Sequence, residues 1–180
     1  MEIKSISIEG PLVIQPKVFF DERGYFFESY NKDLFVKNGI PYEFLQDNQS
    51  LSQKNAVRGL HFQAAPFEQG KLVRVIKGAV LDIIVDIRKN SPSYGQYFGI
   101  ELSEENFTML WIPPGFAHGF STLKDQTIFS YKCTQVYNKA SEGEILWNDP
   151  DLNIDWKVEN PIVSEKDQQL LPLKSFNNPF

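Results

Sequence analysis

Short runs in which apolar and polar residues alternate dominate the chain. In LDIIVDIR, residues 81–88, four aliphatic side chains at odd positions fall on one face of a strand. Ile84 and three charged side chains fall on the other face, an alternation that predicts a half-buried strand. Comparable apolar or aromatic runs lie at residues 4–8, 24–30, 42–50, 71–78, 97–103, 108–113, 118–123 and 127–137.

Turn-forming segments separate these runs, at residues 21–24, 76–78, 89–95, 112–115 and 147–151. Many short strands at regular spacing predict an all-β sandwich or barrel. Only two segments read as helix: residues 31–39, with Asn31 as N-cap and Gly39 just past the end, and one turn after Ser164. The final SFNNPF, residues 175–180, is expected to fray or to be held only by a neighbour.

Composition narrows the class of protein. The 180 residues suit one domain over residues 1–180, and 42% hydrophobic residues are enough for a real core. The net charge of −5, with no basic stripe, argues against a nucleic-acid partner. A locally basic pocket for a small anion remains compatible with this charge.

Cysteine usage and hydropathy bear on the compartment. Cys133 is the only cysteine, so no intrachain disulfide can form, which suits a reducing cytosol. The first residues carry charges at Glu2 and Lys4 and do not resemble a signal peptide. No window approaches the roughly 20 apolar residues that span a bilayer. We therefore expect a cytoplasmic protein without a membrane partner.

The sequence gives little support for a metal centre or for catalysis by a nucleophilic side chain. Only His61 and His118 could supply imidazole ligands, and there is no H-x-H or C-x-x-C spacing. No G-x-S-x-G elbow and no phosphate-binding glycine loop appears either. We predict neither a metal nor a cofactor.

Acid–base chemistry is better supported. His61, in VRGLHFQ, is either a buried structural histidine or a base that titrates near neutrality. Lys71 opens a strand soon afterwards and could stabilise an oxyanion. Tyr131 shares a strand face with Phe129 and Cys133, as either a core tyrosine or a proton donor. His118, after a Pro-Pro-Gly turn, could simply cap a carbonyl.

These motifs together resemble the dTDP-4-dehydrorhamnose 3,5-epimerase family. The similarity runs from about residue 12 to residue 172, in family order. Its matching segments are residues 21–30, 46–52, 57–63, 69–95, 102–123, 131–138, 141–150 and 164–172. The resemblance implies a cupin-like double-stranded β-helix, or jelly roll, with a few short helices. It also implies a homodimer and a dTDP-linked 4-keto-6-deoxy sugar as substrate.

The resemblance also implies site residues. His61 is the base, Asp167 its partner, Tyr131 the opposing acid, and Lys71 the cation near the 4-keto oxygen. Tyr137 matches an aromatic that stacks on thymine, and Phe19 and Phe26 would line the same cleft. The other implied substrate contacts are Arg23, Glu28, Gln46, Asp47, Asn48, Arg58, Lys71, His118, Glu142 and Lys166. The chemistry needs no cofactor, because a 4-ketone acidifies the protons on carbons 3 and 5.

One geometric difficulty lies in the strand that carries His61. In a regular strand, Arg58 and His61 would point to opposite faces. A bend or bulge at Gly59 would let both meet one substrate. Alternatively, Arg58 reaches the diphosphate of a ligand held by a partner's edge.

Several activities remain open. An enzyme of this family that inverts only carbon 3 or only carbon 5 would carry nearly the same residues. More distant readings are a sugar-nucleotide ketoisomerase, a metal-dependent cupin oxygenase, and a binding module without catalysis. The sequence favours the double epimerase.

Overall fold

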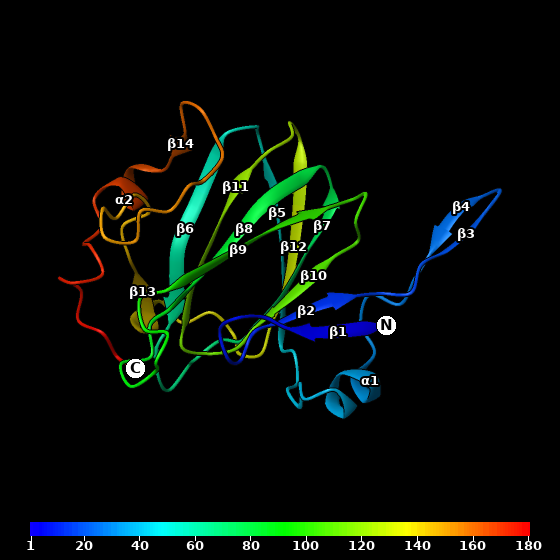
Figure 1. The fold of residues 1–180 in the computed structure, drawn as a ribbon, viewed down its shortest axis with the longest axis horizontal. Coiled ribbons are helices and arrows are strands. Elements are labelled where there is room, and N and C mark those ends of the chain that lie inside the picture. Colours follow the sequence, from blue (N-terminus) through cyan, green and yellow to red (C-terminus); the bar gives the residue numbers. More distant parts are fainter.

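Two β-sheets face each other in the computed structural model, which describes residues 1–180 (Figure 1). The first sheet has the strand order β1-β2-β10-β7-β12-β5. The second has the order β13-β6-β11-β8-β9, and the short β14 pairs with β6. Every pairing is antiparallel except that of β14 with β6. This arrangement confirms the predicted all-β, jelly-roll class.

The elements are short, as the sequence pattern predicts. The first sheet comprises β1 (Glu2–Ser5), β2 (Leu12–Gln15), β5 (Gln46–Ser52), β7 (Lys71–Lys77), β10 (Met109–Ile112) and β12 (Thr127–Cys133). The second comprises β6 (Ala56–Gln63), β8 (Ala79–Asp86), β9 (Tyr97–Ser103), β11 (Phe116–Thr122), β13 (Glu142–Glu144) and β14 (Ile162–Val163). The remaining elements are β3 (Phe19–Asp21), β4 (Gly24–Phe26), α1 (Lys32–Lys37), the 3-10 turn η1 (Lys139–Ser141) and α2 (Glu165–Gln168).

Two apolar layers cover both faces of the second sheet. Between the sheets, Ile84 and Phe120 pack with Phe129 of the opposite sheet. On the outer face, Ile83 packs with Trp156 and other residues of the C-terminal segment. Strand β8 is therefore almost wholly buried. The expectation of a half-buried strand at residues 81–88 is wrong, because the chain's own C-terminal third covers the face that would otherwise meet water.

The C-terminal tail is part of this outer layer. Asn178 is buried, and its Nδ2 donates to the carbonyl oxygen of Ile87 at 2.7 Å. The rings of Phe176 and Phe180 both meet the ring of Phe62 edge to face. The tail is thus held by its own chain, which corrects the expectation that it frays or needs a neighbour.

Both predicted helix caps are confirmed. The Asn31 side chain accepts from the backbone N–H of Leu34 at the start of α1. The Ser164 side chain accepts from the backbone N–H of Asp167 and so begins α2. Neither helix has the length and hydrophobicity that a membrane crossing requires.

The hairpin of β3 and β4 projects away from the two sheets (Figure 1). Its aromatic side chains are exposed, with 71% of Phe20 and 68% of Phe26 accessible. Large apolar side chains on a projecting ribbon are unusual for a surface that meets only water.

Candidate active site

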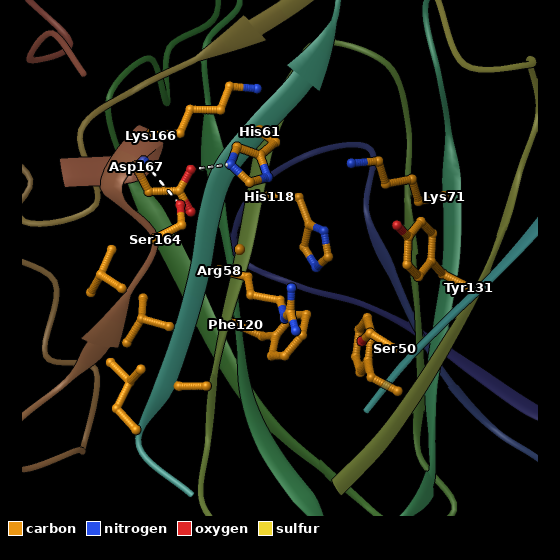
Figure 2. A pocket seen from close by; sticks show the side chains of 16 residues that line it. Ser50, Arg58, His61, Lys71, His118, Phe120, Tyr131, Ser164, Lys166 and Asp167 are labelled. Atoms are coloured by element: carbon orange, nitrogen blue, oxygen red, sulfur yellow. Dashed lines mark hydrogen bonds and ion pairs between the residues drawn. The ribbon is translucent and has the colours of Figure 1, made fainter. Parts of the chain in front are cut away.

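A cavity of about 490 Å³ opens between the two sheets. Side chains that were predicted separately from the sequence meet in it. They are Arg58, His61, Lys71, His118, Tyr131, Lys166 and Asp167. Figure 2 shows His61 and Asp167 on one side, and Lys71 and Tyr131 on the opposite side. The arrangement places ionisable groups on two facing walls of one space.

A β-bulge lets Arg58 and His61 share this cavity. Along the pairing with β11, His118 lies opposite His61 and Phe120 lies opposite Arg58, so β6 carries one extra residue in between. Gly59 lies in this bulge with a φ of 137°, a backbone conformation that favours glycine. The predicted bulge at Gly59 is confirmed.

A close backbone contact also requires glycine in the bulge. A Cβ atom on Gly59 would lie 2.5 Å from the Cα of Gly119 on β11. A Cβ on Gly119 would lie 2.7 Å from the carbonyl oxygen of Arg58. The two strands approach each other this closely because neither residue has a side chain. Arg58 is then held in place by its Nε, which donates to the Ser52 hydroxyl at 3.1 Å.

His61 forms a pair with Asp167. Its Nε2 lies 2.8 Å from Asp167 Oδ1, and the side chains are 33% and 5% exposed. Burial alone would raise the pKa of Asp167, but hydrogen bonds from His61, the Gly59 N–H and the Ser164 cap lower it on balance. An ionised Asp167 accepts the Nε2 hydrogen, and in the neutral form of the ring this leaves the lone pair on Nδ1. Figure 2 shows that second nitrogen on the cavity side of the ring.

His118 forms a second pair, with Asp82 of β8. Nε2 lies 2.8 Å from Asp82 Oδ2, and here the side chains are only 7% and 0% exposed. Burial lowers the pKa of His118 and raises that of Asp82, although each partner opposes the shift of the other. Asp82 Oδ1 has no hydrogen-bond partner.

Lys71 and Tyr131 form the opposite wall. Lys71 has no ion-pair partner, and burial lowers its pKa while the charges of Asp82 and Glu142 oppose the shift. Burial likewise raises the pKa of the Tyr131 phenol. At neutral pH, Tyr131 is therefore a neutral hydroxyl that can donate a proton. Lys71 is placed to stabilise negative charge in the cavity.

A smaller adjoining cavity, of about 140 Å³, shares His61, Lys71 and Tyr131 with the first. Four further predicted contacts line it, namely Gln46, Asn48, Tyr137 and Glu142. Gln46 Oε1 accepts from the Tyr137 N–H at 2.7 Å, which ties the loop after β12 to β5. The two cavities therefore adjoin at the residues that they share.

Five predicted contacts lie elsewhere. Asp47 is on the opposite face of β5 and pairs with Lys132 at 2.9 Å, because strand side chains alternate. Phe19 and Phe26 lie on the projecting hairpin (Figure 1), where Arg23 pairs with Asp21. Glu28 follows that hairpin and lines a separate pocket with Phe19. In this chain, these five residues do not line the His61 cavity.

The sequence did not predict two acidic residues near the site, Asp82 and Glu144. Asp82 could have been found, because a carboxylate among the aliphatic residues of a buried strand needs a partner. No sequence pattern indicates Glu144, because the residues around it come from distant segments of the chain. Its Oε1 lies 3.9 Å from His61 Nε2. His61, Glu144 and Asp167 offer ligand atoms within 4.8 Å of one another, but the Lys166 ammonium lies 2.5 Å from Glu144 Oε1 and makes this group a poor site for a metal cation.

The chain is similar in sequence to known proteins. The sequence model of the family described as dTDP-4-dehydrorhamnose 3,5-epimerase matches residues 5–175. An enzyme of that description from Salmonella typhimurium is 52% identical over 169 residues, covering 93% of this chain and 92% of the relative. A dTDP-4-dehydrorhamnose 3-epimerase from Streptomyces niveus is 36% identical over 174 residues, covering 96% and 84%.

The fold is also similar to solved structures. One is the crystal structure of dTDP-6-deoxy-D-glucose-3,5-epimerase from Legionella pneumophila Philadelphia 1 in complex with dTDP-4-keto-L-rhamnose. It superposes with a TM-score of 0.94 at 44% identity, covering 98% of this chain and 94% of that chain.

Proposed function

The chain belongs to the dTDP-4-dehydrorhamnose 3,5-epimerase family, and on this premise we propose how its side chains perform the reaction. As an isomerase of this family, it inverts carbons 3 and 5 of dTDP-4-dehydro-6-deoxy-D-glucose. The product is dTDP-4-dehydro-L-rhamnose, which serves dTDP-L-rhamnose biosynthesis. The observation that carries the proposed mechanism is the position of His61–Asp167 and of Tyr131 on facing walls of one cavity.

His61 begins each inversion. Its Nδ1 takes the proton from the carbon next to the 4-ketone, and the electron pair of the C–H bond moves into an enolate. The imidazolium that forms is stabilised by Asp167 at 2.8 Å. The negative charge moves to the former ketone oxygen, where the Lys71 ammonium stabilises it.

Tyr131 completes the inversion. Its phenol donates a proton to the same carbon from the opposite face, so the carbon regains four bonds with inverted configuration. The phenolate then recovers a proton, and His61 loses its proton, through solvent in the open cavity. The same cycle at the second carbon gives the doubly inverted product, without a change of oxidation state.

The adjoining cavity is proposed to bind the nucleotide. Tyr137 offers a 54% exposed ring on which a thymine can stack, and Gln46 holds its backbone in place. Arg58 and Lys166 lie at the cavity wall and match the negative charge of a diphosphate.

We further propose a homodimer that brings the projecting hairpin to the site of a second copy. The support is the exposure of Phe19 (53%) and Phe26 (68%) on a two-stranded ribbon that forms no strand pairing with either sheet. The hairpin also carries Arg23, an implied substrate contact that lies outside the cavity of its own protomer. In a dimer that exchanges hairpins, Phe19, Arg23 and Phe26 would each contact the substrate site of the other copy.

Deuterium wash-in tests the mechanism. In D₂O with dTDP-4-dehydro-6-deoxy-D-glucose, the enzyme should place one deuteron on carbon 3 and one on carbon 5, counted by NMR. Incorporation at one carbon alone would favour a single-site epimerase like the 36% identical relative. The His61→Ala variant should lose incorporation at both carbons while calorimetry still detects dTDP binding. Unchanged turnover in this variant would refute the proposed mechanism.

A further inference from the structure

Glu144 faces His61 across two paired strands. Strand β13 runs antiparallel to β6, with Glu144 opposite His61 and Glu142 opposite Gln63. Directly opposed residues project to the same face of a sheet, so the Glu144 side chain lies beside the imidazole. Its Oε1 is 3.9 Å from Nε2, and only 13% of the side chain is exposed.

Alternation along β13 also puts Glu142 and Glu144 on one face, with Gly143 between them. A Cβ on Gly143 would lie 2.1 Å from the Phe62 ring, so the residue between the two acids has no room for a side chain. Lys166 lies over both carboxylates, with Nζ 2.5 Å from Glu144 Oε1 and 3.0 Å from Glu142 Oε2. The negative charges of Glu144, first, and of Glu142 raise the pKa of Lys166.

Lys166 would be an unfavourable neighbour for the base without Glu144. It precedes Asp167 in the one-turn helix α2, so its ammonium lies close to the place where His61 must become an imidazolium. Two positive charges at short range in a half-buried site repel each other. Glu144 opposes this effect because its Oε1 lies within 4 Å of both the Lys166 ammonium and the His61 ring nitrogen, at 2.5 and 3.9 Å.

We infer that Glu144 is a positioning residue for the base: it neutralises Lys166 beside the His61–Asp167 pair and supplies a second carboxylate on the Nε2 side of His61. This inference rests on the proposed role of His61. It concerns a residue that is not among the implied substrate contacts. Glu144 acts through His61 and Lys166 rather than on the substrate.

Other charged or titratable side chains also lie near His61. They are Asp167 and Lys166 of α2, Glu142 of β13, Arg58 of β6, His118 of β11 and Lys71 of β7. Glu144→Gln changes one of the local charges and keeps the size of the side chain. Glu159→Gln is the matched control, because Glu159 is exposed and forms no ion pair.

The test is the pH profile of deuterium wash-in at saturating substrate. For Glu144→Gln, the acid side of the profile should move to lower pH by about half a unit to one unit, with a fall of about five-fold in the rate at neutral pH. The Glu144→Gln/Lys166→Gln double variant should move part of the way back, because the uncompensated ammonium is gone. A role in folding alone would not be reversed by a second substitution.

The single variant Lys166→Gln should shift the pH profile in the opposite direction to Glu144→Gln. This test does not depend on the stability of the other variants. The substitution removes the ammonium and leaves Glu144 beside His61, so the acid side should move to higher pH. Profiles of Glu144→Gln or Lys166→Gln that coincide with those of the native protein and Glu159→Gln would overturn the inference. Activity in His61→Ala would instead overturn the proposed function, so the two failures are distinguishable.

Discussion

His61–Asp167 and His118–Asp82 each join Nε2 to a carboxylate oxygen at 2.8 Å, yet they differ in their surroundings. His61 is one-third exposed in the cavity, whereas the side chains of His118, which lines the same cavity, and of Asp82 are almost fully buried. The pKa of Asp167 is lowered on balance by the hydrogen bonds it accepts, while burial raises the pKa of Asp82. The same contact therefore gives a pair that can exchange protons with a ligand and a pair that serves as a fixed support.

The largest expected difference between the pairs is in activity. His61→Asn should slow deuterium wash-in at least about 10³-fold, because no other side chain can take the substrate proton. His118→Asn should slow it by less than about 10²-fold, because His118 contacts the cavity without acting as the base. Both rates are measured at saturating substrate, with dTDP binding as the control for an intact site. Equal losses would contradict the division of roles.

The next difference should appear in stability. Asp82→Ala leaves a buried imidazole without its partner, which should lower the free energy of unfolding by about 2 kcal/mol. Asp167→Ala should cost less, because water in the cavity can reach His61. Urea unfolding at neutral pH measures both variants against the native protein. A larger loss for Asp167→Ala would show that the outer pair also serves the fold.

The smallest expected effect is that the contributions of Asp167 and Asp82 to the free energy of unfolding change with pH in opposite directions. The lowered pKa of Asp167 contributes stability that is present above its ordinary value of 3.8 and is lost as the pH falls below it. The raised pKa of Asp82 contributes stability that is present below 3.8 and is lost as the pH rises. As the pH rises from about 2 through 3.8, Asp167→Asn should therefore lose stability relative to the native protein, and as the pH rises above 3.8, Asp82→Asn should gain it. Urea midpoints across this range test both slopes, and slopes of the same sign would contradict the assignment.

Local signals explain what the sequence could predict. The caps at Asn31 and Ser164 act within one helical turn, and the short strands follow from alternation and turn residues. The bulge at Gly59 could be predicted because Arg58 and His61 would point to opposite faces of a regular strand, whereas both were expected to contact one substrate. The family resemblance then connected distant segments that local patterns could not, such as His61 and Asp167, 106 positions apart.

What the sequence pattern missed depends on tertiary contacts. The burial of β8 comes from a C-terminal segment some 70 residues further on, which no alternation within residues 81–88 records. Glu144 meets His61 only through the pairing of β13 with β6. The hairpin residues Phe19, Arg23 and Phe26 lie outside the His61 cavity of this chain, and no local sequence pattern records which surface the hairpin meets.

The contact between Gly59 and Gly119 also limits how this site can vary. A methyl group at either position would strike the backbone of the opposite strand, so neither residue can change while the other stays in place. Replacing both glycines would bring two side chains into the same space. In a saturation library selected only for folded protein, both positions should therefore return glycine. The geometry that brings Arg58 and His61 together is thus protected by the requirements of folding, independently of any selection on the reaction.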